Sequence, residues 1–248
     1  MLIQKIFLNG LGLNAGELND FSTHISNYYK NSQGLLIIVH INLRNYYFMH
    51  KDPELMKNIK EYSLPVLDGI GMKFAVMLKK KIIVKDLNGT DLFPLVMNSF
   101  DNERKRIFLI GGTEEIMRKT VESIRNNYSS ITISGYHNGF FSEDEEEDII
   151  DSINQADTEI LLLSMSFPLE EQFAFRNREK LKVKMVWNLG GLFDILSGKK
   201  RRAPLLLRKI RLEWLYRFLK EPGRMVHRNT VAAFWSISHI LLNDDKQI

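Results

Sequence analysis

Cysteine is absent from the sequence, and this absence excludes several kinds of chemistry. Without a thiol, the chain can form no disulfide framework, no cysteine-ligated metal site and no cysteine nucleophile. The chain is nevertheless 248 residues long and 44% hydrophobic, which is enough to bury a core without cross-links. We therefore expect one α/β domain, either alone or with an appendage.

Long hydrophobic runs are also absent. Near the N-terminus a short apolar stretch follows Lys5 but is interrupted by Asn9 and Gly10, so this segment lacks the long h-region of a signal peptide. The longest nearly uncharged apolar run, 231–242, is about half of the roughly 20 residues that a spanning helix requires. We expect a cytoplasmic chain that does not cross a bilayer.

Three familiar catalytic signatures are missing as well. The six histidines are scattered, with no pair at helical ligand spacing, so we expect no zinc site. No G-x-S-x-G serine elbow occurs. No Asp-x-Asp pair occurs either, although such a pair commonly holds a divalent ion against a nucleotide-sugar diphosphate. Cationic side chains would therefore have to stabilise any bound diphosphate, a task that suits arginine.

Charge is distributed unevenly along the chain. Segment 199–230 holds eleven Lys or Arg against two Glu, whereas segment 1–198 holds 22 basic and 26 acidic residues. The basic residues are interleaved with Trp, Phe and Leu in two predicted helices, 204–220 and 224–242. This mixture is typical of helices that lie in a membrane interface. Alternatively, both helices pack on the core or on a second copy of the chain, and the pattern leaves the two interpretations open.

Within 1–198, short apolar runs alternate with helical stretches, which predicts a doubly wound, mostly parallel sheet. We therefore divide the chain into an α/β domain, 1–198, and a basic helical appendage, 199–248. The predicted strands are 35–39, 64–67, 106–110, 130–134, 159–163 and 183–187, and the predicted helices include 51–61, 71–80, 142–154 and one that begins near Glu114.

Polar residues follow several predicted strands, at the places where ligands bind in an open parallel sheet. Asp68 follows the strand 64–67, and a carboxylate held there and partly desolvated can acquire a pKa suited to a general base. It could equally cap the helix that starts near Ile70. Gly111 and Gly112 either admit a phosphate to a helix N-terminus or simply form a tight turn. The remaining such positions are His40 to Asn42 and 188–191.

Six strings in order give the chain a resemblance to a known family: LPVLDGIGM at 64–72, NGTDLFP at 88–94, RIFLIGGTEE at 106–115, GYHNGFF at 135–141, NLGGLFDILSGKKRRAP at 188–204 and LEWLYRFLKEPGR at 212–224. The chain resembles the WecG/TagA/CpsF family of bacterial glycosyltransferases (glycosyltransferase family 26) over nearly its whole length. The resemblance implies a Rossmann-like enzyme that moves a sugar, with inversion, from a UDP-sugar to a polyprenyl-diphosphate-linked acceptor sugar. It places this reaction at the inner face of the cytoplasmic membrane.

The resemblance also implies roles for individual residues. Asp68 matches the proposed general base, and Asn42 with His40 matches the acceptor site. The appendage would complete the active site and dock on an anionic membrane surface, with no metal, no other cofactor and no nucleic-acid partner. The donor would contact Gly111, Gly112, Asn138, Gly139, Glu171 and Asp194, while Arg217, Arg224 and His227 close over its diphosphate.

Three positions depart from the family pattern. Glu170 stands where the family has Gln, Asp86 where it commonly has Arg, and His40 where it sometimes has Thr. The sequence therefore does not decide whether the transferred sugar is a HexNAc, a HexNAc uronic acid or a hexose. It also does not identify the acceptor sugar, the linkage or the oligomeric state. A catalytically inactive, membrane-associated scaffold is the alternative. A nucleic-acid-binding protein is disfavoured because the core is near neutral and the tail is rich in aromatic residues.

Overall fold

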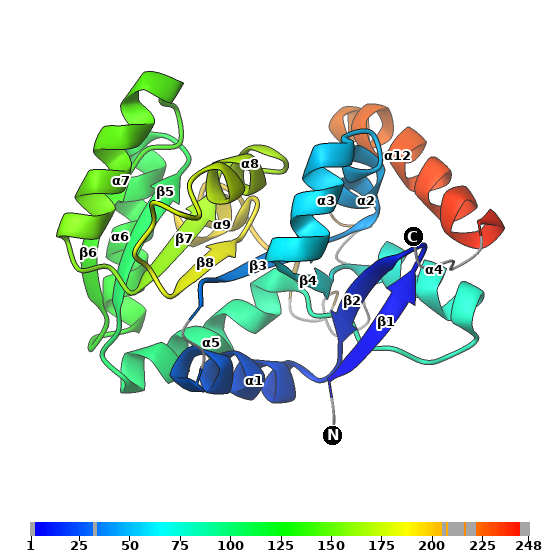
Figure 1. The fold of residues 1–248 in the computed structure, drawn as a ribbon, viewed down its shortest axis with the longest axis horizontal. Coiled ribbons are helices and arrows are strands. Elements are labelled where there is room, and N and C mark those ends of the chain that lie inside the picture. Colours follow the sequence, from blue (N-terminus) through cyan, green and yellow to red (C-terminus); the bar gives the residue numbers. More distant parts are fainter. Residues whose placement is uncertain (1–2, 32–33, 205–206, 208–215, 217–221, 244–248) are drawn as a thin grey trace.

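The structure is a computed structural model that describes residues 3–31, 34–204, 207, 216 and 222–243, with side chains for all of these except 222–229. The described strands form one sheet in the order β1-β2-β4-β3-β8-β7-β5-β6 (Figure 1). Only β1 and β2 pair antiparallel, so the predicted mostly parallel sheet is confirmed. The strands are β1 Gln4–Leu8, β2 Leu11–Ala15, β3 Leu36–Ile41, β4 Leu64–Leu67, β5 Arg106–Gly111, β6 Thr132–His137, β7 Ile160–Ser164 and β8 Met185–Asn188.

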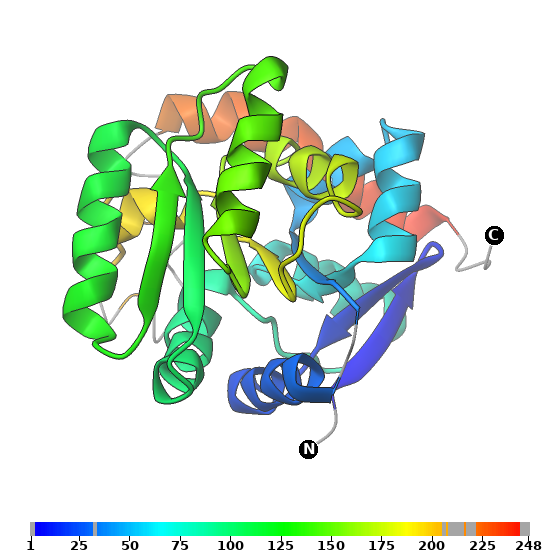
Figure 2. The same cartoon turned by 60° about the vertical axis from the view of Figure 1, so that its left-hand side comes forward.

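Helices cover both faces of this sheet, as a doubly wound fold requires. One buried cluster joins the sheet to α2, α3, α4, α7, α8 and α12, and a second joins it to α1, α5, α6 and α9. Figure 2 shows α6 and α7 on opposite sides of β5 and β6. The helices are α1 Leu18–Asn31, α2 Leu43–Met49, α3 Pro53–Tyr62, α4 Ile70–Lys80, α5 Gly89–Asn102, α6 Glu114–Asn127, η1 Glu143–Glu145 (3₁₀), α7 Glu146–Gln155, α8 Leu169–Arg176, α9 Leu192–Leu196 and α12 Pro222–Leu242.

The central strand β3 is apolar apart from its fifth residue, His40. All six of its residues are buried. Because successive side chains point to opposite faces, Ile37 and Val39 enter one cluster while Leu36 and Ile38 enter the other. Such a strand has no solvent-facing side, so apart from the buried His40 its polar neighbours begin where it ends.

The antiparallel hairpin of β1 and β2 was not predicted. Its turn is the dipeptide Asn9-Gly10, in which both residues have positive φ, 48° and 77°. These values suit a two-residue type I′ turn, for which Asn-Gly is the preferred sequence. The two residues that interrupt the apolar stretch are therefore the turn of a hairpin.

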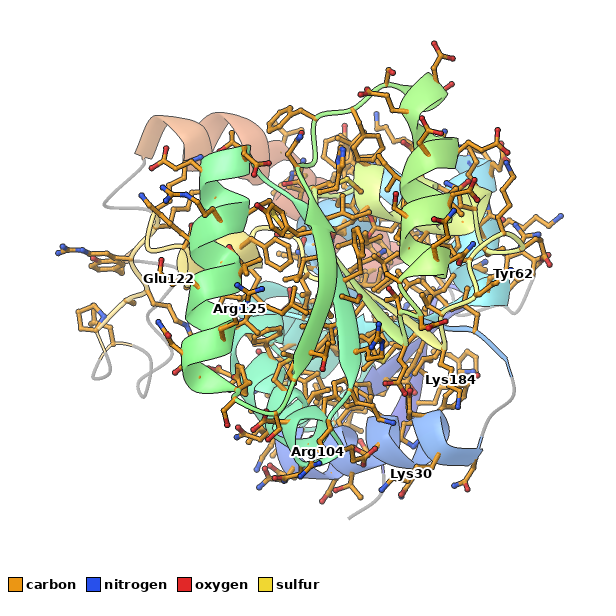
Figure 3. All side chains as sticks on the ribbon, turned by 90° about the vertical axis from the view of Figure 1, so that its left-hand side faces the viewer. Lys30, Tyr62, Arg104, Glu122, Arg125 and Lys184 are labelled. Carbon is orange, nitrogen blue, oxygen red and sulfur yellow. The ribbon has the colours of Figure 1, made fainter. Side chains whose placement is uncertain are left out.

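The predicted strand at 130–134 is displaced, because β6 runs from Thr132 to His137. This strand is an edge strand, and its residues are half-buried or exposed, so it has no strong apolar signal of its own. Pairing with β5 sets its extent instead, from Arg106 opposite Thr132 to Ile110 opposite His137. Figure 3 views this edge, with Glu122 and Arg125 on the outer side of α6.

The helix predicted at 224–242 is confirmed as α12, which packs against α2 and α4. Ser236 Oγ donates to the carbonyl of Leu43 at 2.7 Å, and Asn9 Nδ2 donates to the carbonyl of His239 at 3.2 Å. One side of this helix is therefore docked on the domain. No helix among the described residues is long and apolar enough to cross a bilayer. The helix predicted at 204–220 lies outside the described residues apart from Pro204, Leu207 and Tyr216.

A buried hydrogen bond links β3 to β8 at the centre of the sheet. Trp187 Nε1 donates to His40 Nε2 at 3.0 Å, and both side chains are buried. An indole N–H only donates, so this bond requires His40 Nε2 to be unprotonated. Burial lowers the pKa of His40 from 6.5 to about 4. His40 is therefore neutral at physiological pH.

This pKa shift predicts a loss of stability in acid. In the unfolded chain His40 takes up a proton as the pH falls through 6.5, whereas in the folded chain it stays neutral until the pH nears 4. The unfolded state therefore binds more protons between these pH values. The stability that this neutral His40 contributes above pH 6.5 is lost progressively as the pH falls from 6.5 towards 4. We expect His40 to account for a loss of about 2 kcal/mol between pH 7.5 and pH 5.

The measurement is urea unfolding of the wild type and of His40→Gln at both pH values. Glutamine keeps an acceptor for Trp187 but does not titrate, and all other histidines are common to both proteins. The wild type should therefore lose about 2 kcal/mol more than the variant. An equal loss in the two proteins contradicts the assignment.

Candidate active site

A pocket of about 670 Å³ opens at the carboxyl ends of β3, β4, β7 and β8. It lies around the boundary between β3 and β8, where β4 is added on one side and the later strands on the other. This is the topological switch point at which open α/β sheets bind ligands. Residues from both halves of the sheet therefore face one cavity, from Asn42 and Asp68 on one side to Glu170 and Gly190 on the other.

The register of β3 and β4 brings Asn42 and Asp68 together. Ile41 lies opposite Leu67, and the N–H of Asp68 donates to the carbonyl of Ile41 at 3.1 Å. The N-cap position of α4 is Gly69, so Asp68 does not occupy the capping position considered from the sequence. Both predicted residues line the pocket. The carboxylate is thus placed at the end of a buried strand, where it can reach a bound hydroxyl.

Asn42 has a structural task besides facing the pocket. Its Oδ1 accepts from the N–H of Asn45 at 3.0 Å, which caps α2. Asn45 Nδ2 in turn donates to the carbonyl of His40 at 2.8 Å. These bonds hold the loop after β3 rigid. The Asn42 amide nitrogen remains a donor group at the pocket wall.

His40 also lines the pocket, but its ring is held by Trp187. A Cβ at Gly89 would lie 3.2 Å from His40 Cε1, so a larger residue at that position would push on the ring. Gly89 belongs to the NGTDLFP string, for which the sequence suggested no site role. Asn88, Gly89 and Thr90 all line the pocket, and Asn88 caps α5 by accepting from the N–H of Thr90 at 2.9 Å.

Glu170, rather than the predicted Glu171, faces the pocket. The N–H of Gly190 donates to Glu170 Oε1 at 2.9 Å, and the N–H of Met165 donates to Oε2 at 3.1 Å. Burial nevertheless raises the pKa of Glu170 to about 7. Burial, and then the charge of Glu170, raises the pKa of Glu171, which interacts with Asn188 and Arg44 and is not among the residues that line the pocket. Two buried carboxyls this close resist ionising together.

A cluster of basic residues closes one side of the pocket. Lys199, Lys200 and Arg201 line it together with the predicted Asp194. Asp194 forms ion pairs with Lys200 and with Lys199, the latter at 3.6 Å. The next residue, Arg202, pairs with Asp91 of α5 at 2.5 Å and so anchors the loop. Asp194 therefore positions cations at the pocket rather than presenting a lone negative charge.

Other predicted donor residues lie beyond this pocket. Gly111, Gly112, Asn138 and Gly139 gather at the ends of β5 and β6, where the N–H of Gly139 donates to the carbonyl of Gly112 at 2.9 Å. A Cβ at Gly111 would lie 2.4 Å from the carbonyl oxygen of Ser164, so this glycine is needed for close packing against β7. None of the four lines the described pocket.

The predicted cations of the appendage are outside what the structure describes. Arg217 is not among the described residues, and the side chains of Arg224 and His227 are not described. Tyr216 is described, and it lines the pocket. Together with Lys199, Lys200 and Arg201, four described residues of the appendage therefore line the pocket.

Sequence reasoning missed several pocket residues. Arg44 follows Asn42 by two positions and lines the pocket from the first turn of α2. Lys199, Lys200 and Arg201 were counted within the basic segment, but nothing in the pattern distinguished them from its other cations. The available signal was that they directly follow Gly198, where the α/β domain ends, and this position could have indicated that they lie near the pocket.

The described residues contain no group of three or more His, Asp or Glu that could hold a metal ion. The polar groups that line the pocket include amides, a strand-end carboxylate and a set of cations. Such a set can deprotonate a hydroxyl and stabilise a phosphate anion. That the reaction needs no metal stays a prediction.

Comparison with known proteins agrees with this chemistry. The chain matches the glycosyl transferase WecG/TagA/CpsF family over residues 6–246. It is similar to a protein of Bacillus spizizenii named N-acetylglucosaminyldiphosphoundecaprenol N-acetyl-beta-D-mannosaminyltransferase, with 28% identity over 219 residues that cover 88% of this chain and 84% of that protein. A protein of the same name from Bacillus subtilis is 25% identical over 207 residues, which cover 84% of this chain and 80% of that protein.

The match spans both the α/β domain and the basic appendage, so the resemblance inferred from the six strings is confirmed along nearly the whole chain. The predicted enzyme class is confirmed with it. The chain belongs to the WecG/TagA/CpsF family of glycosyltransferases.

Proposed function

We propose that this chain transfers a sugar from a UDP-sugar to a sugar carried on polyprenyl diphosphate, with inversion and without a metal. The observation that carries the proposal is the pocket in which Asp68 and Asn42 face Lys199 to Arg201. The names of the two relatives supply the transferred sugar and the acceptor, because both describe transfer of N-acetylmannosamine to a diphosphoundecaprenol-linked N-acetylglucosamine. The UDP carrier comes from the family resemblance. The enzyme would work at the cytoplasmic face of the membrane that holds its acceptor.

Asp68 acts as the general base in this proposal. It accepts the proton of the acceptor hydroxyl while the hydroxyl oxygen attacks C1 of the donor sugar. A single displacement of this kind inverts the anomeric centre. Asn42, held by its capping bond, presents its amide nitrogen to the acceptor. His40, neutral and fixed by Trp187, adds no charge to the acceptor side of the pocket.

Cations stabilise the departing UDP. Negative charge grows on the diphosphate as the bond to C1 breaks, and preorganised positive groups in a confined site stabilise that charge most effectively. Lys199, Lys200 and Arg201 are suitably placed at the pocket. By the family resemblance, Arg217, Arg224 and His227 join them from the appendage.

Glu170 bears on which sugar is transferred. It stands where the family has Gln, and its carboxyl faces the pocket. A donor that carries its own carboxylate would meet unfavourable charge here whenever Glu170 is ionised. The relatives transfer N-acetylmannosamine, so a neutral HexNAc is the first candidate ahead of a HexNAc uronic acid.

The experiment that tests the function is a screen of UDP-sugars against a short-chain lipid-diphosphate N-acetylglucosamine, read by mass spectrometry with and without EDTA. We expect one or a few donors, UDP-N-acetylmannosamine first, to give a disaccharide product. Turnover should persist in EDTA, because cations replace the metal. Absence of UDP release with every donor would favour the inactive scaffold, and loss of activity in EDTA would contradict the metal-independent mechanism.

Asp68→Asn should lower kcat by about 10²–10⁴-fold, because the amide cannot accept the proton. The affinity for UDP, measured by calorimetry, should stay near that of the wild type. Asp52→Asn is the matched control: Asp52 caps α3 by accepting from the N–H of Leu55, and asparagine caps equally well. Normal turnover of Asp68→Asn would remove Asp68 from the role of base.

Lys200→Ala should weaken UDP binding about tenfold, since it removes a charge-assisted contact worth about 1.5 kcal/mol and leaves Asp194 less neutralised. Calorimetric titration with UDP measures this effect. Lys119→Ala is the control, because Lys119 forms a comparable ion pair with Glu115 on the exposed surface of α6. Equal affinities of the two variants for UDP would contradict the proposed role of the basic loop.

A further inference from the structure

An exposed apolar row runs along α4, the helix that begins directly after Asp68-Gly69. Ile70, Phe74 and Leu78 are 40%, 55% and 47% exposed, and their spacing of four residues places them on one side of the helix. The opposite side is anchored in the core, where Met72 and Val76 are fully buried. The helix is therefore firmly held while it presents large apolar side chains outward.

Two more exposed apolar residues follow the end of the helix. Ile82 and Ile83 are 41% and 85% exposed, after Lys81 ends the helix in the left-handed conformation. Segment 69–84 contains four lysines and no Asp or Glu, and the next residue, Lys85, pairs with Glu17. We name Ile70, Phe74, Leu78, Ile82 and Ile83 the α4 ridge.

The neighbouring helix α12 has the same character. It packs against α4, and Lys79 Nζ donates to the carbonyl of Asn243 at 2.6 Å. Its residues Val231 and Phe234 are 66% and 75% exposed, and segment 222–243 contains no Asp or Glu. Figure 1 shows the two helices at the same end of the molecule.

We propose that the α4 ridge inserts into the interface of an anionic lipid bilayer. Large apolar side chains flanked by lysines, with no acidic residue among them, are complementary to a surface of acyl chains below anionic headgroups. The same lysines oppose burial of the ridge against a second copy of this chain, because like charges would then be brought together. The ridge belongs to the α/β domain, so docking extends beyond the appendage to which the sequence assigned it.

The position of the ridge couples docking to the pocket. Its first residue, Ile70, is two positions from Asp68, and α4 of eleven residues is about 16 Å long. This part of the inference rests on the proposed function, in which the acceptor's lipid tail lies in the same bilayer. A bilayer along the α4 ridge would then hold the acceptor's diphosphate next to the carboxylate that activates its sugar.

The first test is sedimentation of the full chain with vesicles of phosphatidylcholine and about 30% phosphatidylglycerol. Phe74→Ser/Leu78→Ser should lower the vesicle partition coefficient about tenfold or more, because it removes two large apolar groups. Phe140→Ser is the control, since Phe140 is 75% exposed but follows β6 at the opposite edge of the sheet. Wild-type binding by the double variant would overturn the proposal.

The second test uses the absence of cysteine. Phe74→Cys and Phe140→Cys each create one site for an environment-sensitive fluorophore. On vesicles, the probe at position 74 should shift to the blue and be quenched by spin-labelled acyl chains, whereas the probe at position 140 should do neither. Equal responses at the two positions would overturn the proposal. It would also be overturned if the wild type sediments as a dimer, Phe74→Ser/Leu78→Ser sediments as a monomer, and the two bind vesicles equally, because the α4 ridge would then be a contact between copies of the chain.

Activity separates this inference from the proposed function. With a water-soluble short-chain acceptor, Phe74→Ser/Leu78→Ser should turn over like the wild type. With a long-chain acceptor in vesicles, it should be about tenfold slower. Equal slowing of the double variant on both acceptors would count against a docking role. Failure of the wild type on both would count against the proposed function, and the vesicle-binding results would still decide the role of the α4 ridge.

Discussion

The parallel pairing of β3 with both β4 and β8 is the constraint on which the pocket depends. One neighbour places Asp68 beside Asn42, and the other brings Gly190 and the support of Glu170 to the same edge. The hydrogen bond from Trp187 to His40 joins the two sides just below the cavity. Because these elements are buried on both faces, the polar groups at their ends are held by packing rather than by flexible loops.

Charged side chains at the pocket are held in place by a neighbouring strand, backbone group or ion-pair partner. Asp68 stands at a strand end, Glu170 is held by backbone N–H groups, and Lys200 is paired with Asp194. A buried or half-buried charge is costly unless it has such a partner. The strand-end carboxylate and the basic residues therefore line one cavity from different elements.

Sequence reasoning was most accurate where burial leaves a strong pattern. The strand at 64–67 matches β4 exactly in extent, and the other predicted buried strands agree within two residues, because a strand covered on both faces is continuously apolar. Asp68 and Asn42 could be placed from those strands alone. The edge strand β6 was misplaced because its pairing with β5, rather than its own side chains, decides its length.

Orientation within loops and short helices could not be predicted. Glu170 and Glu171 are adjacent, and only the three-dimensional course of the segment after β7 decides which one faces the pocket. The orientation of Lys199 to Arg201 towards the pocket likewise depends on contacts with residues far away in sequence. One such contact is the ion pair of the next residue, Arg202, with Asp91. Short-range patterns contain no information about such contacts.

The strand order has a consequence for how the chain matures. During synthesis β3 emerges early, but its partner β8 follows some 145 positions later, so the inner edge of β3 stays unsatisfied until most of the polypeptide exists. An unpaired, largely apolar strand of this kind invites association with other nascent chains. High contact order also slows collapse into the native topology. Efficient production of this protein therefore depends on shielding that strand until the last segment of the sheet arrives.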